Sequence, residues 1–138
     1  WDDLARGGPA SNEQAYGLSK LANILFTAEL ARRLDGTGVT ANCLHPGFVA
    51  TRFGDGSGGL LQALMPLAKL IAISPEKGAA TIVHLASSPQ VEGITGKYFF
   101  RAKPVEPSLA AQDDAVAAWL WTQSEKLSAA AHRSGVFG

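Results

Sequence analysis

The sequence predicts an α/β fold, and within that class the C-terminal portion of a doubly wound parallel sheet. Apolar residues recur at three- and four-residue steps over 13–34, which predicts a helix. After Gly36 and Gly38, the short run 39–44 is rich in small and β-branched residues and predicts a strand. A helix followed after a short turn by a strand is typical of α/β architecture. Only one further strand is indicated, at 95–100, so the rest of the sheet is expected upstream.

The remaining elements are predicted from helix-capping residues and from residues that begin or end helices. Ser11 or Asn12 is suited to cap the first helix, since a short polar side chain there accepts from the first backbone N–H groups. Ser74 followed by Pro75 predicts the start of a second helix that runs to about Ser87. A polar connection is expected over 101–108, followed by a last helix over 113–127. The predicted order is therefore helix, strand, an apolar segment, helix, strand, helix.

The whole chain, 1–138, is expected to be the C-terminal part of one domain whose N-terminal half is absent. Its 138 residues and 46% hydrophobic content suffice for a real core. The chain begins with Trp1, and its one methionine is Met65. A piece of a longer chain, a processed product and an incomplete record are the three explanations for that start.

Composition excludes several classes of function. Lys plus Arg equals Asp plus Glu at 12 each, so no basic face for nucleic acid is indicated. Cys43 is the one cysteine, which excludes an internal disulfide framework and a cysteine-based metal site. The three histidines have unrelated spacing, and no metal site is predicted. A reducing compartment, the cytoplasm, is the expected location.

Tyr16 and Lys20 are the residues most suggestive of chemistry. They stand at i and i+4 in the predicted first helix, so their side chains share one face. An ammonium next to a phenol stabilises the phenolate and lowers the pKa of the tyrosine, which suits proton transfer. Such a pair also occurs by chance on solvated helix faces, so spacing alone leaves both interpretations open.

A second group of residues follows the first predicted strand. Pro46 and Gly47 make a tight turn that can bring backbone close to a ligand. In open α/β sheets, ligands bind at the carboxyl ends of the strands. Thr51 offers a hydroxyl a few residues later. An ordinary turn after a strand is the alternative, and a structural role is also expected for His45.

Taken together, the two groups of residues resemble the short-chain dehydrogenase/reductase family, and in particular its retinol-dehydrogenase-like members. The resemblance rests on a Tyr-x-x-x-Lys helix, a short turn, a strand, then Pro-Gly and Val-x-Thr, in that order. It covers nearly the whole chain, and it is carried by 16–34, 38–47, 96–100 and the helix that contains Trp119-Leu-Trp121. It implies a Rossmann-like domain and a hydride transfer between NAD or NADP and an alcohol or carbonyl compound.

The resemblance also implies a role for each matching residue. Tyr16 would be the general acid/base for the alcohol oxygen, and Lys20 would lower its pKa and bind the ribose hydroxyls of the nicotinamide half. The cofactor-binding residues implied in this way are Tyr16, Lys20, Pro46, Gly47, Val49 and Thr51.

Parts of the family pattern are absent from this chain. The glycine-rich phosphate loop and the residue that selects NAD or NADP belong to the N-terminal half in the family, so the choice of cofactor stays open. The family's catalytic serine would precede Trp1, and neither Ser11 nor Ser19 is a substitute for it. The 138-residue chain alone is therefore expected to be inactive.

The apolar segment 60–72 matches the position of the family's substrate loop, which suggests a hydrophobic substrate or a lid. A core or partner-facing helix is an open alternative, and contact with a membrane is not expected because Lys69 gives only a thin polar face. The helix over 13–34 could also form a homo-oligomer. The competing hypothesis for function is a truncated, non-catalytic binding or regulatory module.

Overall fold

The computed structural model describes residues 11–47 and 74–133. The chain divides into two compact units, and each is described by itself. The first unit comprises 1–43, 95–97 and 106–138, and the second comprises 44–94 and 98–105. The apolar segment predicted over 60–72 lies outside the described residues.

The first unit is built on helix α2, Asn12–Arg33, which confirms the first predicted helix. Ser11 caps it, because the Ser11 hydroxyl accepts from the Gln14 N–H at 3.3 Å and the Gln14 side chain accepts from the Ser11 N–H at 3.2 Å. These reciprocal bonds satisfy donors that the first turn of a helix leaves open. The helix ends at Arg33 with Leu34 as its C-cap, and Gly36 follows with a φ of +74° that favours glycine.

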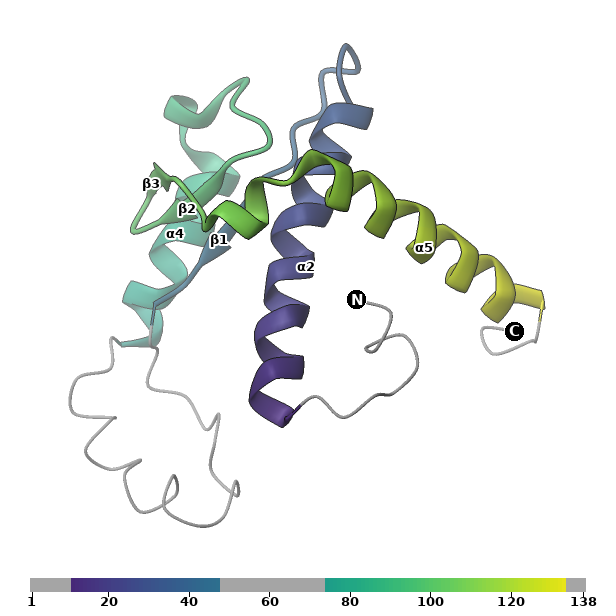
Figure 1. The fold of residues 1–138 in the computed structure, drawn as a ribbon. Helices are drawn as coiled ribbons and strands as arrows, with labels where there is room; N and C mark the ends of the chain where they lie inside the picture. The colour runs from purple at the N-terminus through teal and green to yellow at the C-terminus, as the bar shows by residue number, and fades with distance from the viewer. Residues whose placement is uncertain (1–10, 48–73, 134–138) are drawn as a thin grey trace. The chain divides into compact units, whose positions relative to one another are not determined.

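Two later elements of the same unit, η2 (Leu109–Gln112) and α5 (Asp114–Arg133), pack against α2. Figure 1 shows the start of α5 beside the C-terminal half of α2. Leu25 is fully buried on α2, and small residues from all three elements surround the core: Ala31, Ala111 and Ala117. The last helix is longer than predicted, because the run Ser128–Ala131 is rich in alanine and continues it.

Within the first unit, Ala41–Cys43 pairs with Thr95–Lys97 through backbone bonds. The Gly96 N–H donates to the Ala41 carbonyl at 2.7 Å, and the Cys43 N–H donates to the Lys97 carbonyl at 3.0 Å. The Ala41 N–H instead donates to the Thr95 hydroxyl at 3.0 Å. The side-chain bond explains why the regular strand begins later than the predicted 39–44.

The second unit contains a small mixed sheet of order β1-β2-β3, with a helix between its two parallel strands. Strand β1 is Cys43–His45, with Cys43 at the border of the two units, and β2 is Tyr98–Phe100. Between them lie α4, Pro75–Ser87, and the short η1, Pro89–Val91. Helix α4 is capped by Ser74 as predicted, and a strand–helix–strand unit of this kind is the building block of doubly wound sheets. The α/β prediction is therefore confirmed, although β1 and β2 are shorter than expected.

A third strand, β3 (Lys103–Val105), contradicts the prediction of a polar connection over 101–108. It pairs antiparallel with β2, with Phe100 opposite Lys103. Arg101 and Ala102 form the two-residue turn, and both have positive φ, 51° and 59°. Hairpins prefer this mirror-image turn, which usually carries Asn-Gly. Arg101 and Ala102 are not typical of it, so the sequence did not predict the turn. The Ala102 N–H donates to the hydroxyl of buried Thr81 on α4, which holds the turn in place at 3.1 Å.

Across residues 11–47 and 74–133, no helix is both long enough and apolar enough to cross a bilayer.

Candidate active site

Helix α2 carries Tyr16 and Lys20 on one exposed face. The Lys20 Nζ lies 5.2 Å from the centre of the Tyr16 ring, which is the neighbourhood that the i, i+4 spacing predicts. Tyr16 is 52% exposed, and Lys20 is also exposed. A ligand can therefore reach both groups from the solvent side of the first unit.

Gly17 and Ser19 lie between the members of this pair. A Cβ added at Gly17 would meet nothing within 4 Å. The Ser19 hydroxyl donates to the Tyr16 carbonyl at 2.7 Å, so it is bound to its own helix. The Ser11 hydroxyl serves the helix cap. Both serines thus have local structural contacts.

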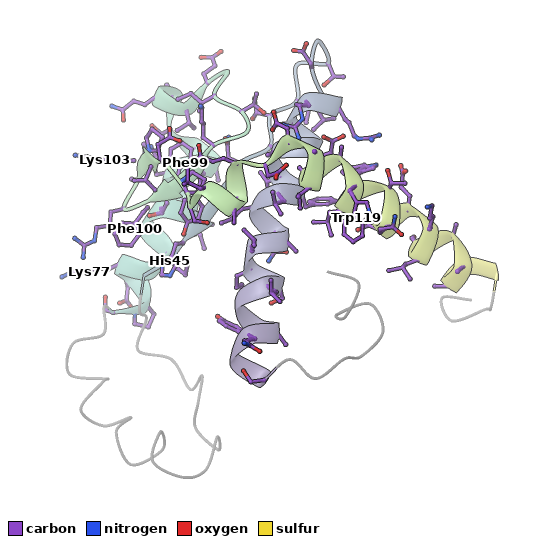
Figure 2. The ribbon with its side chains drawn as sticks, in the orientation of Figure 1. His45, Lys77, Phe99, Phe100, Lys103 and Trp119 are labelled. Atoms are coloured by element: carbon purple, nitrogen blue, oxygen red, sulfur yellow. The ribbon has the colours of Figure 1, made fainter. Side chains whose placement is uncertain are left out.

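The turn after β1 is held by a side chain. The Gly47 N–H donates to His45 Nδ1 at 2.8 Å, and Gly47 has a φ of +87°. A side chain with a Cβ would be strained at that φ, so glycine is required here. His45 also meets Phe100 of β2 edge to face, with ring centres 5.7 Å apart (Figure 2).

Four of the six predicted site residues fall among the described ones. Tyr16 and Lys20 lie together in the first unit, and Pro46 and Gly47 adjoin each other in the second. Val49 and Thr51 lie outside the described residues. Sequence reasoning recognised the Pro-Gly turn but missed the bond that His45 makes to it. The only available signal was a histidine two residues before a glycine.

Cys43 does not have the surroundings of a nucleophile. Burial raises the pKa of its thiol, although hydrogen bonding with Thr27 opposes that shift. A raised pKa reduces the fraction of reactive thiolate. Within the described part of the chain, no cluster of three or more His, Cys, Asp or Glu side chains is placed to hold a metal ion.

Comparison with known proteins decides the family. A family model described as enoyl-(acyl carrier protein) reductase matches residues 4–101, which is most of the chain. The chain belongs to the short-chain dehydrogenase/reductase family. This dehydrogenase/reductase chain is 46% identical to human retinol dehydrogenase 14 over 129 residues, and 41% identical to human retinol dehydrogenase 13 over 122 residues. It is also 40% identical to the human WW domain-containing oxidoreductase over 129 residues.

These matches cover most of the dehydrogenase/reductase chain but a minor part of each relative. They span 91%, 85% and 91% of this chain, against 38%, 37% and 31% of the three human proteins. The chain therefore corresponds to between about a third and two fifths of the length of these relatives. The resemblance to the retinol-dehydrogenase-like group is confirmed by the comparisons.

Proposed function

We propose that this chain is the C-terminal part of an oxidoreductase that transfers a hydride between NAD or NADP and a hydrophobic alcohol or carbonyl compound. The observation that carries the proposal is the exposed pair on α2, where the Lys20 Nζ lies 5.2 Å from the Tyr16 ring. Membership of the short-chain dehydrogenase/reductase family supports an enzyme of this class.

The described donor groups fit the nicotinamide half of the cofactor. An exposed ammonium at Lys20 suits the hydroxyls of a ribose, because it donates several hydrogen bonds without a fixed geometry. In the second unit, Pro46 and Gly47 turn away from the carboxyl end of a parallel strand, where α/β folds bind nucleotides. When bound, the nicotinamide would supply the hydride-transfer chemistry.

The chain's own residues would handle the proton. In the oxidation direction, the Tyr16 phenolate oxygen would accept the proton of the substrate hydroxyl. In the reduction direction, the phenol would return a proton to the carbonyl oxygen. The Lys20 ammonium would stabilise the phenolate by its positive charge. Pro46, Gly47, Val49 and Thr51 would line the nicotinamide side.

The proposed substrate class is a hydrophobic alcohol or its carbonyl product. Two of the relatives carry retinol dehydrogenase in their names, and retinol is an alcohol with a long apolar body. The apolar segment 60–72 would supply the substrate wall or lid. The choice between NAD and NADP would rest with residues upstream of this chain, and the 138-residue chain alone is expected to show no turnover.

The test uses the full-length gene product that contains this chain. Nicotinamide absorbance is followed with a panel of apolar alcohols and aldehydes, and Tyr16→Phe is compared with the parent protein. We expect a loss of about 10²–10⁴-fold in kcat, the usual worth of a positioned general acid/base. Tyr98→Phe is the matched control, because it removes the other phenol of the chain from strand β2.

Two results would contradict the proposal. One is a Tyr16→Phe protein as active as the parent. The other is a parent that binds the dinucleotide but turns over no substrate in the panel, which is what the competing binding-module hypothesis predicts. Location in the cytoplasm and a homo-oligomer through the 13–34 helix stay predictions. Any such oligomer would have to use a face of α2 other than the one that α5 covers.

A further inference from the structure

We propose that His45 is a positioning residue, which holds the Pro46–Gly47 turn in the conformation that receives the nicotinamide end of the cofactor. The inference rests on the proposed function for the identity of the ligand. The contact itself rests on the geometry of the second unit alone, where the Gly47 N–H donates to His45 Nδ1 at 2.8 Å.

The contact between His45 and Gly47 determines the direction of the chain after β1. Gly47 adopts a φ of +87°, and glycine populates both signs of φ about equally. The backbone preference of Gly47 therefore does not select this turn by itself. A bond from its own N–H back to the side chain at i−2 selects the turned form over the extended ones, as Asx-type turns do.

The acceptor, His45 Nδ1, is oriented by a contact with strand β2. The His45 ring meets the Phe100 ring at an interplanar angle of 76°, edge to face, with centres 5.7 Å apart. This contact restricts the imidazole rotamer in which Nδ1 accepts from the Gly47 N–H. The Arg101 guanidinium carbon also lies 5.0 Å from the centre of the Phe100 ring. The packing of the His45 ring on the Phe100 ring therefore helps to hold the bond between Nδ1 and the Gly47 N–H.

The atom of His45 that holds the turn is Nδ1. The δ position of the side chain accepts the bond, and the oxygen of an Asn side chain stands at the same number of bonds from the backbone. In Gln, the equivalent oxygen is one methylene further out. His45→Asn and His45→Gln therefore introduce the same uncharged amide and differ only in whether the acceptor can reach the Gly47 N–H. His45 is exposed, so neither substitution disturbs a core.

The experiment uses the full-length gene product and its two His45 variants. Hydrogen exchange at the Gly47 amide, measured by NMR, reports the contact without any cofactor. Titrations with NADH and, separately, NADPH report the dissociation constant, and steady-state kinetics separate KM from kcat. We expect His45→Asn, which keeps the δ acceptor but lacks the ring that packs on Phe100, to keep most of the protection at Gly47 and most of the affinity of the parent. We expect His45→Gln to lose protection at Gly47 and to weaken dinucleotide binding about five- to tenfold, with kcat nearly unchanged, as for the loss of one hydrogen bond.

Each other outcome overturns the inference at an identifiable step. Equal exchange at Gly47 in all three proteins means that the contact does not hold the turn. Lost protection with unchanged affinity means that the turn does not serve the cofactor. Equal weakening in both variants means that the δ acceptor of residue 45 does not support cofactor binding. A parent that binds neither dinucleotide, or a fully active Tyr16→Phe protein, counts against the proposed function. The Gly47 exchange rates then still decide whether His45 holds the turn.

Discussion

Phe26 of α2 and Trp121 of α5 stack with their ring centres 5.0 Å apart and their planes within 13° of parallel. The Arg33 guanidinium carbon lies 4.6 Å from the centre of the Trp121 ring, and the Trp121 indole N–H donates to Glu125 at 2.7 Å. Helices far apart in sequence are thereby joined through one aromatic side chain. The face of α2 that this contact uses is occupied within the chain itself.

This stack predicts a measurable coupling between the two aromatic residues. Phe26→Ala and Trp121→Ala should each destabilise the chain, and the double variant should lose less than the sum. We expect a coupling energy of about 0.5–1.5 kcal/mol, the usual worth of an aromatic pair beyond its buried area. Thermal unfolding followed by circular dichroism measures it. Leu127→Ala, which truncates a 64% exposed residue of the same helix, should change stability by no more than about 0.5 kcal/mol.

Glu29 makes the first unit sensitive to acid. Its side chain is 9% exposed, and its carboxylate accepts from Arg32 at 3.0 Å and from Arg33 at 2.7 Å. Burial alone would raise the pKa of Glu29, but the hydrogen bonds and charges of both arginines outweigh it and lower that pKa. A lowered folded-state pKa stabilises the fold above the unfolded value of about 4.3, and the stabilisation is lost as pH falls through the folded value.

The melting temperature should therefore fall as the pH is taken from about 5 towards 3, a window set by that ordinary carboxyl value. Glu29→Gln should be less stable at neutral pH and should show a shallower decline on acidification. Glu106→Gln, which removes an exposed carboxylate of the same unit, is the control and should follow the parent curve. Parallel curves for Glu29→Gln and the parent would show that the carboxylate carries none of the dependence.

Gly96 should be less tolerant of a side chain than Gly93. Both have positive φ, +70° and +71°, so alanine is strained at either position. A Cβ at Gly96 would also approach the Ala31 Cβ of α2 to 3.3 Å, whereas at Gly93 it would meet nothing within 4 Å. Gly93→Ala should cost about 1 kcal/mol and Gly96→Ala clearly more, as measured by urea unfolding. Equal costs would mean that the contact with Ala31 relaxes freely.

The β2–β3 turn should be improved by glycine. Ala102 has a φ of 59°, a conformation that costs an L-residue about 1–2 kcal/mol, while glycine adds about 0.5–1 kcal/mol of chain entropy. Ala102→Gly keeps the N–H that donates to Thr81, so we expect a net stabilisation of up to about 1 kcal/mol. Ala118→Gly, inside helix α5, should destabilise by about 0.5–1 kcal/mol. A loss of stability in both variants would argue against strain at the turn.

The sequence predicted most elements of the fold because their signals are local. The capping residues Ser11 and Ser74 and the apolar spacing of α2 are each read within a few positions. Strand β3 was missed because Arg101 and Ala102 are not the residues that such a turn prefers. What holds that turn is the Thr81 hydroxyl, about twenty residues earlier in the chain. No local pattern reports a partner at that distance.

In the candidate site too, contacts within one element were predicted and contacts between elements were not. Tyr16 and Lys20 were predicted to be neighbours because four residues is about one helical turn, and they are neighbours. His45 was expected to be structural, but the atom it binds and the ring that orients it were not foreseen. Phe100 reaches His45 only through the pairing of β1 with β2.

By itself, the sequence determined the α/β class, the first helix with its Tyr16–Lys20 face, and the family that these residues indicate. Each depends on spacing along a single element or on a short run of residues. The tertiary structure decided which side chains support those elements: Trp121 on α2, Thr81 at the hairpin turn and Phe100 beside His45. Such contacts join residues distant in the chain, and their energy exists only once folding has brought the two sides together.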